Sequence, residues 1–447
     1  MNLLSLLAGL TKSDPHATVA IDADPAQPVH VSRSELWRRA LQLRADLATA
    51  GVGRGDAVAL WLPNWSAVLD WHIATASLGA HTVGLDLAAT PDTVASVLAR
   101  AKPKVIALAH GPSAPVARDL PSPVRTLRAA LDSLGSGTAL TEQVPAVAVV
   151  TGPHDIPPVD PGNSDVGGGA WLPSTTTVGM PMPVTRGDEL AVAFGPRLAA
   201  HRESAITRHA AAVADAIGIG ADDTVACTLP LTGAFGFVLG LAALSGGATC
   251  LLEPSPTAEA VLDDLTRFGV THLGVDTGFA TALTGAWHRR PGPLPHLRWL
   301  GLSGPPSEPH DTDGADDTEE QARRAASWAE DKLGAVCAGG YGSAEVLALS
   351  AVQPAGSPRR WSQGGRLVSP GIEARVVDPG SGLPLVHGER GELQIRGYPV
   401  VEGYLGDEEA TSARLAEHDW FPTGDLAVLS GSGELRRLGK IPAPHRD

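Results

Sequence analysis

The most informative part of this sequence is Tyr341-Gly342-Ser343-Ala344-Glu345, which is followed downstream by Trp420-Phe421-Pro422-Thr423-Gly424-Asp425. Between the two lie Gly391-Glu392-Leu393-Gln394-Ile395-Arg396-Gly397 and then Gly403-Tyr404. Each stretch taken alone is only moderately specific. Their order along the chain is the stronger signal, and it organises the rest of the sequence.

Length and composition limit the classes of function. A chain of 447 residues is too long for one small core, so we expect two or more subdomains. The formal net charge of −15 argues against a nucleic acid or an anionic membrane as partner, because both favour a basic surface. No run approaches the ~20 apolar residues needed to span a bilayer, and the apolar start lacks the basic flank of a signal peptide. These features predict a cytoplasmic protein.

Helix and strand signals alternate over residues 30–110 and again over 188–340, which favours parallel strands covered by helices. Residues 151–187 are rich in Pro, Gly, Ser and Thr without periodicity, as in a long loop or linker. The acidic stretch 308–320 is expected to be a solvated loop. After residue 346, short strands and tight turns predict a small, mostly antiparallel subdomain. The clearest expected elements are strands at 57–62, 82–85, 105–108, 190–194, 224–229, 248–253, 270–275 and 298–302, and helices at 66–79 and 257–268.

The stretches quoted first resemble signature motifs of the adenylate-forming (AMP-binding) ligase superfamily, which includes acyl-CoA synthetases, peptide-synthetase adenylation domains and luciferases. The resemblance covers most of the chain and implies the large domain of such a ligase. The expected fold class is α/β, with two doubly wound subdomains, 1–187 and 188–345, and a β-rich subdomain at 346–447. The family's smaller C-terminal domain, which carries a lysine that stabilises the adenylation transition state, is expected to be absent because the chain stops at Asp447.

The resemblance also implies a nucleotide site and its ligands. Tyr341 would stack on adenine, Glu345 would coordinate Mg²⁺ through a hard carboxylate oxygen, and Asp425 would accept hydrogen bonds from the ribose hydroxyls. ATP or AMP and Mg²⁺ are the implied cofactors if the site functions. An alternative for both acids is a solvated carboxylate in a loop. The implied nucleotide-binding set is completed by Gly342, Ser343, Ala344 and Gly304.

The expected phosphate loop departs from the family pattern. Counted back from His209, it reads Gly195-Pro196-Arg197-Leu198-Ala199-Ala200-His201-Arg202-Glu203-Ser204. Arg197 and Ala200 replace glycines that would let backbone approach phosphate. Glu203 occupies the position of the family's lysine and reverses its charge, whereas Arg197, His201 and Arg202 still offer cations. A structural alternative makes 204–217 an amphipathic helix, and a rival phosphate loop is Ser174–Met182.

Two further departures from the family pattern affect the phosphate-binding and acyl-binding parts of the expected site. Ala344 stands where threonine is common, so a hydroxyl is lost. Pro230–Gly236 resembles the acyl-pocket segment, but Gly233 replaces its usual histidine. Phe235, Gly236 and His209 are the acyl-pocket residues implied, and the expected ligand is a small carboxylic acid or acyl group.

Three functional hypotheses follow. The chain is a degenerate family member that binds a nucleoside, an acyl ligand or a protein partner but adenylates poorly. Alternatively, it is a working AMP-forming carboxylate ligase that uses Arg197, Arg202 or Mg²⁺ on Glu345. The third hypothesis is a split enzyme whose missing domain comes from a second chain. No residue can be assigned as catalytic from the sequence.

Overall fold

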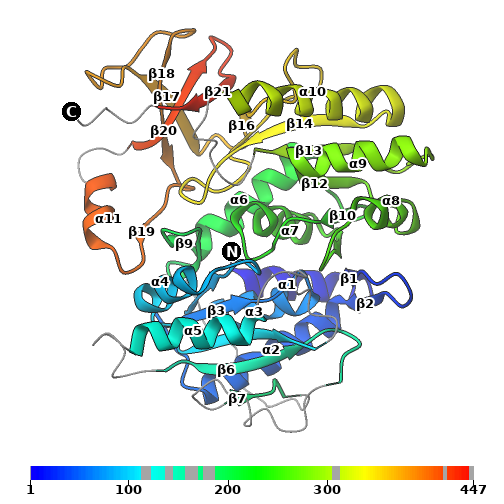
Figure 1. Cartoon of the computed structure of the whole chain (residues 1–447), viewed down its shortest axis with the longest axis vertical. Coiled ribbons are helices and arrows are strands. Elements are labelled where there is room, and N and C mark those ends of the chain that lie inside the picture. The colour runs from blue at the N-terminus through cyan, green and yellow to red at the C-terminus, as the bar shows by residue number, and fades with distance from the viewer. Residues whose placement is uncertain are drawn as a thin grey trace.

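The computed structural model describes residues 2–111, 122–135, 144–156, 170–174, 187–304, 313–415 and 420–441. It confirms the α/β class: two sheets carry helices on their faces, and one of them continues into antiparallel strands. In Figure 1 the smaller sheet and its helices lie at the bottom, the parallel part of the larger sheet lies above them, and the antiparallel strands lie at the upper left.

The smaller sheet has the strand order β19-β9-β8-β4-β3-β5-β6-β7. Its central strands are parallel, and β3 is buried along its whole length because helices cover both faces. The strands and helices expected between residues 57 and 108 are confirmed to within a few residues. The elements are β3 Ala57–Trp61, α3 Ser66–Ser77, β4 His81–Gly84, α4 Pro91–Ala101, β5 Val105–His110, α5 Pro123–Gly135, β6 Ala146–Thr151, β7 Ala170–Trp171, β8 Leu190–Phe194, β9 Ala199–Arg202 and β19 Gly403–Tyr404.

At one edge of the larger sheet, strands from the start of the sequence pair with a strand from its middle. β1 pairs in parallel with β11, and β2 pairs antiparallel at the edge. Strands therefore cross the expected division at 187/188, and that division stays a prediction. The parallel part is formed by β1 Thr18–Asp22, β11 Thr249–Leu252, β10 Thr224–Cys227, β12 His272–Asp276, β13 Trp299–Ser303 and β14 Val336–Tyr341, with β2 Val29–Ser32 at the edge.

The expected antiparallel subdomain is also present. From β14 onward every strand pairing in the described part of the larger sheet is antiparallel. The strands are β15 Ala351–Val352, β16 Gly364–Leu367, β17 Ile372–Val377, β18 Arg390–Gly397, β20 Phe421–Leu429 and β21 Leu435–Lys440, with α11 Glu408–Leu415 beside them.

The layers run helix, sheet, helix, sheet, helix. Alternate residues of β3 separate into two cores, as the pleat of a strand requires: Trp61 packs with α4 and α5, whereas Leu60 packs with the middle helices. The larger sheet has its own outer core against α8–α10. The middle layer contains α1 Leu3–Ser13, α2 Arg33–Thr49, α3, α6 Glu203–Ile217 and α7 Ala234–Gly246; the outer layer contains α8 Ala258–Arg267, α9 Thr277–Arg289 and α10 Asp313–Leu333.

The expectation of a loop at 308–320 is wrong for residues 313–320, which begin α10. Residues 305–312 lie outside the described part of the chain. The apolar anchors of the helix come after its acidic start: Ala322, Ala325, Ala329 and Trp328 are buried against the larger sheet. Alanine, glutamate and arginine also have high helix propensity, so the acidic stretch extends the helix instead of forming a loop.

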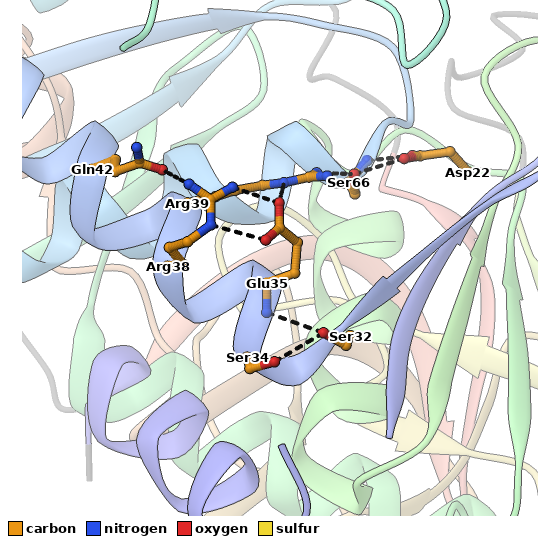
Figure 2. Close-up of polar contacts among 8 residues, drawn as sticks. All are labelled: Asp22, Ser32, Ser34, Glu35, Arg38, Arg39, Gln42 and Ser66. Atoms are coloured by element: carbon orange, nitrogen blue, oxygen red, sulfur yellow. Dashed lines mark hydrogen bonds and ion pairs between the residues drawn. The ribbon is translucent and has the colours of Figure 1, made fainter. Parts of the chain in front are cut away.

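A buried carboxylate links the larger sheet to a helix of the middle layer. Asp22 ends β1 in the larger sheet, and its oxygens accept from the backbone N–H and hydroxyl of Ser66 at 2.5 and 2.7 Å. Ser66 begins α3, whose N-cap residue Trp65 supplies no side-chain bond, so Asp22 satisfies the helix terminus from a different segment. Figure 2 shows this contact beside the ion pairs of Glu35 with Arg38 and Arg39.

Asp70, one turn along α3, costs more free energy to bury than Asp22 does. Its side chain is buried, and its Oδ1 atom has no hydrogen-bond partner among the described residues. Burial raises the pKa of Asp70 well above its ordinary value, and the nearby Asp22 carboxylate adds to the shift. The folded protein therefore binds a proton on Asp70 more tightly than the unfolded chain does.

The sign of this linkage predicts a stabilising substitution. As pH rises above the unfolded-state pKa, the buried acid should lower the free energy of unfolding by up to about 1.4 kcal/mol per pH unit until its folded pKa is passed. Asp70→Asn should remove that loss and unfold at a higher temperature than the native chain at pH 8, with a smaller gain at pH 5. Thermal unfolding at both values measures it. Asp215→Asn, at an exposed position of α6, is the matched control, and equal gains at both pH values would contradict the prediction.

Candidate functional site

The centre of the candidate site is a hydrogen bond between two of the predicted residues. The hydroxyl of Tyr341, at the end of β14, donates to Oδ2 of Asp425, in β20, at 2.8 Å. Both side chains are buried. Burial, with the adjacent carboxylate, raises the pKa of Tyr341 well above its ordinary value, so its hydroxyl keeps the proton that it donates. The first and last signature motifs are thus in direct contact.

Two cations from β21 complete the surroundings of Asp425. Nε of Arg437 donates to Oδ1 at 2.7 Å, and Nζ of Lys440 lies 3.5 Å from the same oxygen. Asp425 is a satisfied buried carboxylate, which corrects the alternative of a solvated one. Its negative charge is compensated within the protein.

Gly304 lies at the same place. It follows β13, which is parallel to β14 and adjacent to it, and the carboxyl ends of parallel strands are where ligands bind in such sheets. A Cβ at Gly304 would lie 1.4 Å from Nε2 of Gln363, so any larger residue there would displace the Gln363 side chain. Oε1 of Gln363 in turn accepts from Nη1 of Arg437 at 3.2 Å. The predicted residues Gly304, Tyr341 and Asp425 therefore converge.

Glu345 is half-buried a few residues beyond β14, and its Oε2 accepts from the hydroxyl of Ser343 at 2.9 Å. Gly342 packs against the backbone of Leu347 and Ala348. Within the described residues no group of three or more acidic, histidine or cysteine side chains is placed to hold a metal. One hard carboxylate beside a hydroxyl fits Mg²⁺ that arrives with nucleotide phosphates, because Mg²⁺ commonly uses one or two carboxylates plus phosphate oxygens.

The expected phosphate loop is a tight β-hairpin. β8 and β9 pair antiparallel, and the turn Gly195–Leu198 connects them. Gly195 has φ +69°, and a Cβ there would lie 3.3 Å from that of Ala344. β9 also pairs with β19, and the amide of Val401 donates to the carbonyl of Glu345 at 2.7 Å. The hairpin is thus fixed against the Tyr341–Glu345 motif.

The basic side chains of the hairpin have different surroundings. Arg202 forms an ion pair with Glu402 at 2.9 Å. His201 is buried, its Nε2 donates to the carbonyl of Ala344 at 2.6 Å, and burial lowers the pKa of His201 to about 4, so the ring is neutral at pH 7. Arg197 is exposed and lies 5.9 Å from the ring centroid of Tyr404. Arg197 is the hairpin cation that forms no ion pair with a described carboxylate.

Glu203 is not where the family resemblance suggested. Its side chain is buried, and Oε1 accepts from the backbone N–H of Leu3, at the start of α1, at 2.9 Å. The carboxylate satisfies a helix N-terminus, where negative charge is favoured. The prediction that Glu203 sets an acidic charge against the phosphates is therefore corrected: the residue faces the N-terminal helix. The structural alternative for 204–217, a helix, is confirmed by α6.

The implied acyl-pocket residues lie on two neighbouring helices. Phe235 is half-buried in α7 near Gly274 and Gly340, and Gly236 packs against the carbonyls of Leu229 and Pro230. His209, in α6, is fully buried, and its Nε2 donates to the carbonyl of Ala348 at 2.8 Å. Burial lowers the pKa of His209 to about 4.

The rival phosphate loop, 174–182, lies outside the described residues except for Ser174, which binds Asp46. A groove of about 580 Å³ lies between Gly218–Asp223 and Pro295–Arg298. It sits beside the amino ends of β10 and β13, whereas the signature residues follow the carboxyl ends of β13 and β14. No described helix is long and apolar enough to cross a membrane.

Sequence reasoning missed Gln363 and Arg437. The pair Arg436-Arg437 is typical of a solvated charged strand, and the register of β21 decides which of the two arginine side chains faces inward. The available signal was alternation: successive residues of a strand face opposite sides, so one of two adjacent arginines must face inward.

Comparison with known proteins identifies relatives. The profile of a family described as AMP-binding enzyme matches residues 11–166 and 196–405. A 4-coumarate–CoA ligase-like protein of Oryza sativa subsp. japonica is 31% identical over 48% of this chain and 36% of its own length. A probable CoA ligase of Humulus lupulus is 24% identical over 94% of this chain and 71% of its own. The chain thus matches about a third of the rice relative's length.

Solved structures agree on the fold. The benzoate CoA ligase of Burkholderia xenovorans LB400 superposes with a TM-score of 0.77 at 20% identity, covering 98% of this chain and 80% of that one. MatB of Rhodopseudomonas palustris, solved with ATP bound, gives 0.74 at 21% identity, with 98% and 79% covered.

The placement of Glu203 makes a direct prediction. Glu203→Ala should lower the free energy of unfolding by roughly 1–3 kcal/mol, because the α1 terminus loses a buried acceptor. Glu402→Ala, which breaks the more exposed pair with Arg202, should cost less than about 1 kcal/mol. Urea unfolding measures both.

Glu203→Lys separates the two interpretations of this position. It should destabilise the fold without raising affinity for ATP, since the side chain faces α1. Tighter ATP binding by a folded Glu203→Lys variant, measured by calorimetry, would show that the position faces phosphate.

Proposed function

The chain belongs to the AMP-binding enzyme family, and from that premise we propose that it is an acyl-CoA-synthetase-like protein that binds an adenine nucleotide but adenylates carboxylates poorly. The nucleotide would lie at the carboxyl ends of β13 and β14, against Tyr341, Gly304 and Asp425. The expected second ligand is a small carboxylic acid or acyl group near Phe235. CoA ligases among the relatives support this class of ligand.

The observation that carries the proposal is the contrast between the two halves of the site. On the nucleoside side, residues from β13, β14 and β20 converge and their polar atoms are satisfied. On the phosphate side, the turn Gly195–Leu198 has one glycine. His201 is neutral at pH 7, and Arg202 is paired with Glu402. A triphosphate would gain little electrostatic stabilisation there, and such stabilisation usually contributes more to catalysis than any other single effect.

Mg²⁺ would be held by Glu345 together with the nucleotide phosphates, and it would supply charge neutralisation when bound. The chain's own residues position the ligands. Tyr341, buried and fixed by Asp425, limits where a base can lie, and the hairpin excludes water from one side of Ala344.

One observation favours a working ligase as the second candidate. Arg197 is exposed on the hairpin turn and forms no ion pair with a described carboxylate. A guanidinium suits phosphate oxygens, because its planar fork can bind two of them. If Arg197 turns toward a bound triphosphate, the hairpin regains one cation.

Nucleotide titration and ATP–pyrophosphate exchange test the proposal together. The purified chain should bind AMP and ATP saturably and with similar affinity, because the γ-phosphate finds few donors. Exchange across a carboxylate panel should stay at background. Robust exchange by the chain alone would establish the working ligase, and Arg197→Met should then abolish it. Exchange that appears only when a second protein is added would establish a split enzyme.

A substitution tests the nucleoside side. Tyr341→Leu keeps apolar bulk but removes the ring and hydroxyl, so AMP affinity should fall about tenfold, as expected when a base–aromatic stack worth about 1–3 kcal/mol is lost. Trp287→Leu, in the outer helix α9, is the control for loss of a half-buried aromatic side chain. Equal AMP affinity in the native chain and Tyr341→Leu, by isothermal calorimetry, would remove Tyr341 from the site.

A further inference from the structure

Arg437 occupies an oxygen of Asp425, the carboxylate that the family resemblance assigns to the ribose hydroxyls. Its Nε atom donates to Oδ1 of Asp425 at 2.7 Å, and Tyr341 already donates to Oδ2 at 2.8 Å. Lys440 adds a third, more distant positive group at 3.5 Å. A carboxylate that is only 5% exposed has little remaining access for a ligand hydroxyl.

Arg437 is also the better fixed of the two cations. Nη1 donates to Oε1 of Gln363 at 3.2 Å, and the backbone N–H of Arg437 donates to the carbonyl of Gln363 at 3.0 Å. The Arg437 side chain is 23% exposed, against 42% for Lys440. Lys440 makes the longer and more exposed contact with Asp425, whereas Arg437 is held from two sides and is therefore the competitor that a ligand hydroxyl would have to displace.

We propose that Arg437 competes with the ribose hydroxyls of a bound nucleotide for the Asp425 carboxylate, and thereby sets both the affinity and the ribose selectivity of the site. The inference rests on the proposed function, because it assumes that a nucleotide binds against Tyr341 and Asp425. Arg437 acts through Asp425 and is a positioning residue. Its presence makes the protein indifferent to the ribose hydroxyls, since their acceptor is already engaged.

The first test needs no substitution. Calorimetric titration of the native chain with AMP and with 2′,3′-dideoxy-AMP should give dissociation constants within about twofold of each other. A tenfold or greater preference for AMP would show that the ribose hydroxyls already reach Asp425, and it would overturn the inference while leaving the proposed function intact. Binding of neither nucleotide at millimolar concentration would overturn the proposed function and the inference with it.

The second test removes the competitor. Arg437→Met keeps the length of the side chain but not its donors, so AMP should bind about tenfold more tightly, as expected for one hydrogen bond to a charged acceptor. The affinity for 2′,3′-dideoxy-AMP should change by less than about twofold, because this nucleotide lacks the hydroxyls that would bind the freed oxygen of Asp425. The ratio of the dissociation constants for the two nucleotides should therefore change, whereas a purely structural role of Arg437 would leave it unchanged.

Arg436→Met is the matched control, because the adjacent residue of β21 faces the other side of the strand. It should leave both dissociation constants unchanged. Thermal unfolding of each variant verifies a cooperative fold. A folded Arg437→Met variant with an unchanged ratio, or with equally changed affinities for both nucleotides, would contradict the proposal.

Discussion

A buried carboxylate must find its partners inside the protein, and at Asp425 this requirement holds the candidate site together. Its partners come from β14 and β21, so one side chain joins the parallel part of the larger sheet to its antiparallel extension. The two signature motifs lie far apart in the sequence, yet they meet through the hydrogen bond from Tyr341 to Asp425. The rest of the site, including Gly304 and Gln363, is arranged around that contact.

The same requirement is met differently at two other acids. Asp22 binds the start of α3, and Glu203 binds the start of α1. In both cases backbone N–H groups that a helix cannot satisfy itself serve as donors, and the partial positive charge of the terminus favours the anion. These contacts link the smaller sheet, the middle helices and the larger sheet, which is why the molecule keeps acidic residues in its interior.

The sequence predicted most of the architecture and part of the site. β3, α3 and the strands of the second half were predictable because their apolar runs and helical spacing are local signals. The resemblance assigned Tyr341 and Asp425 to one nucleotide site, but it did not predict the hydrogen bond between them. The direction of Glu203 was not predictable, because a matched position locates a Cα atom and leaves the side chain to whatever packs beside it, here an N-terminal helix. Arg437 escaped notice for a related reason: register decides which of two adjacent arginines faces inward. The start of α10 was misjudged because acidic composition was weighed above helix propensity.

The pairing of β1 with β11 has a consequence for how the chain reaches this structure. During synthesis, the ribosome releases the first strands of one sheet, then nearly all of the other, and only afterwards the strand that β1 needs. In chain order, strands of the larger sheet stand before and after most strands of the smaller one, so β1 cannot form its parallel pairing until β11 has been synthesised. Early strands with open edges are prone to wrong pairing until that late strand emerges.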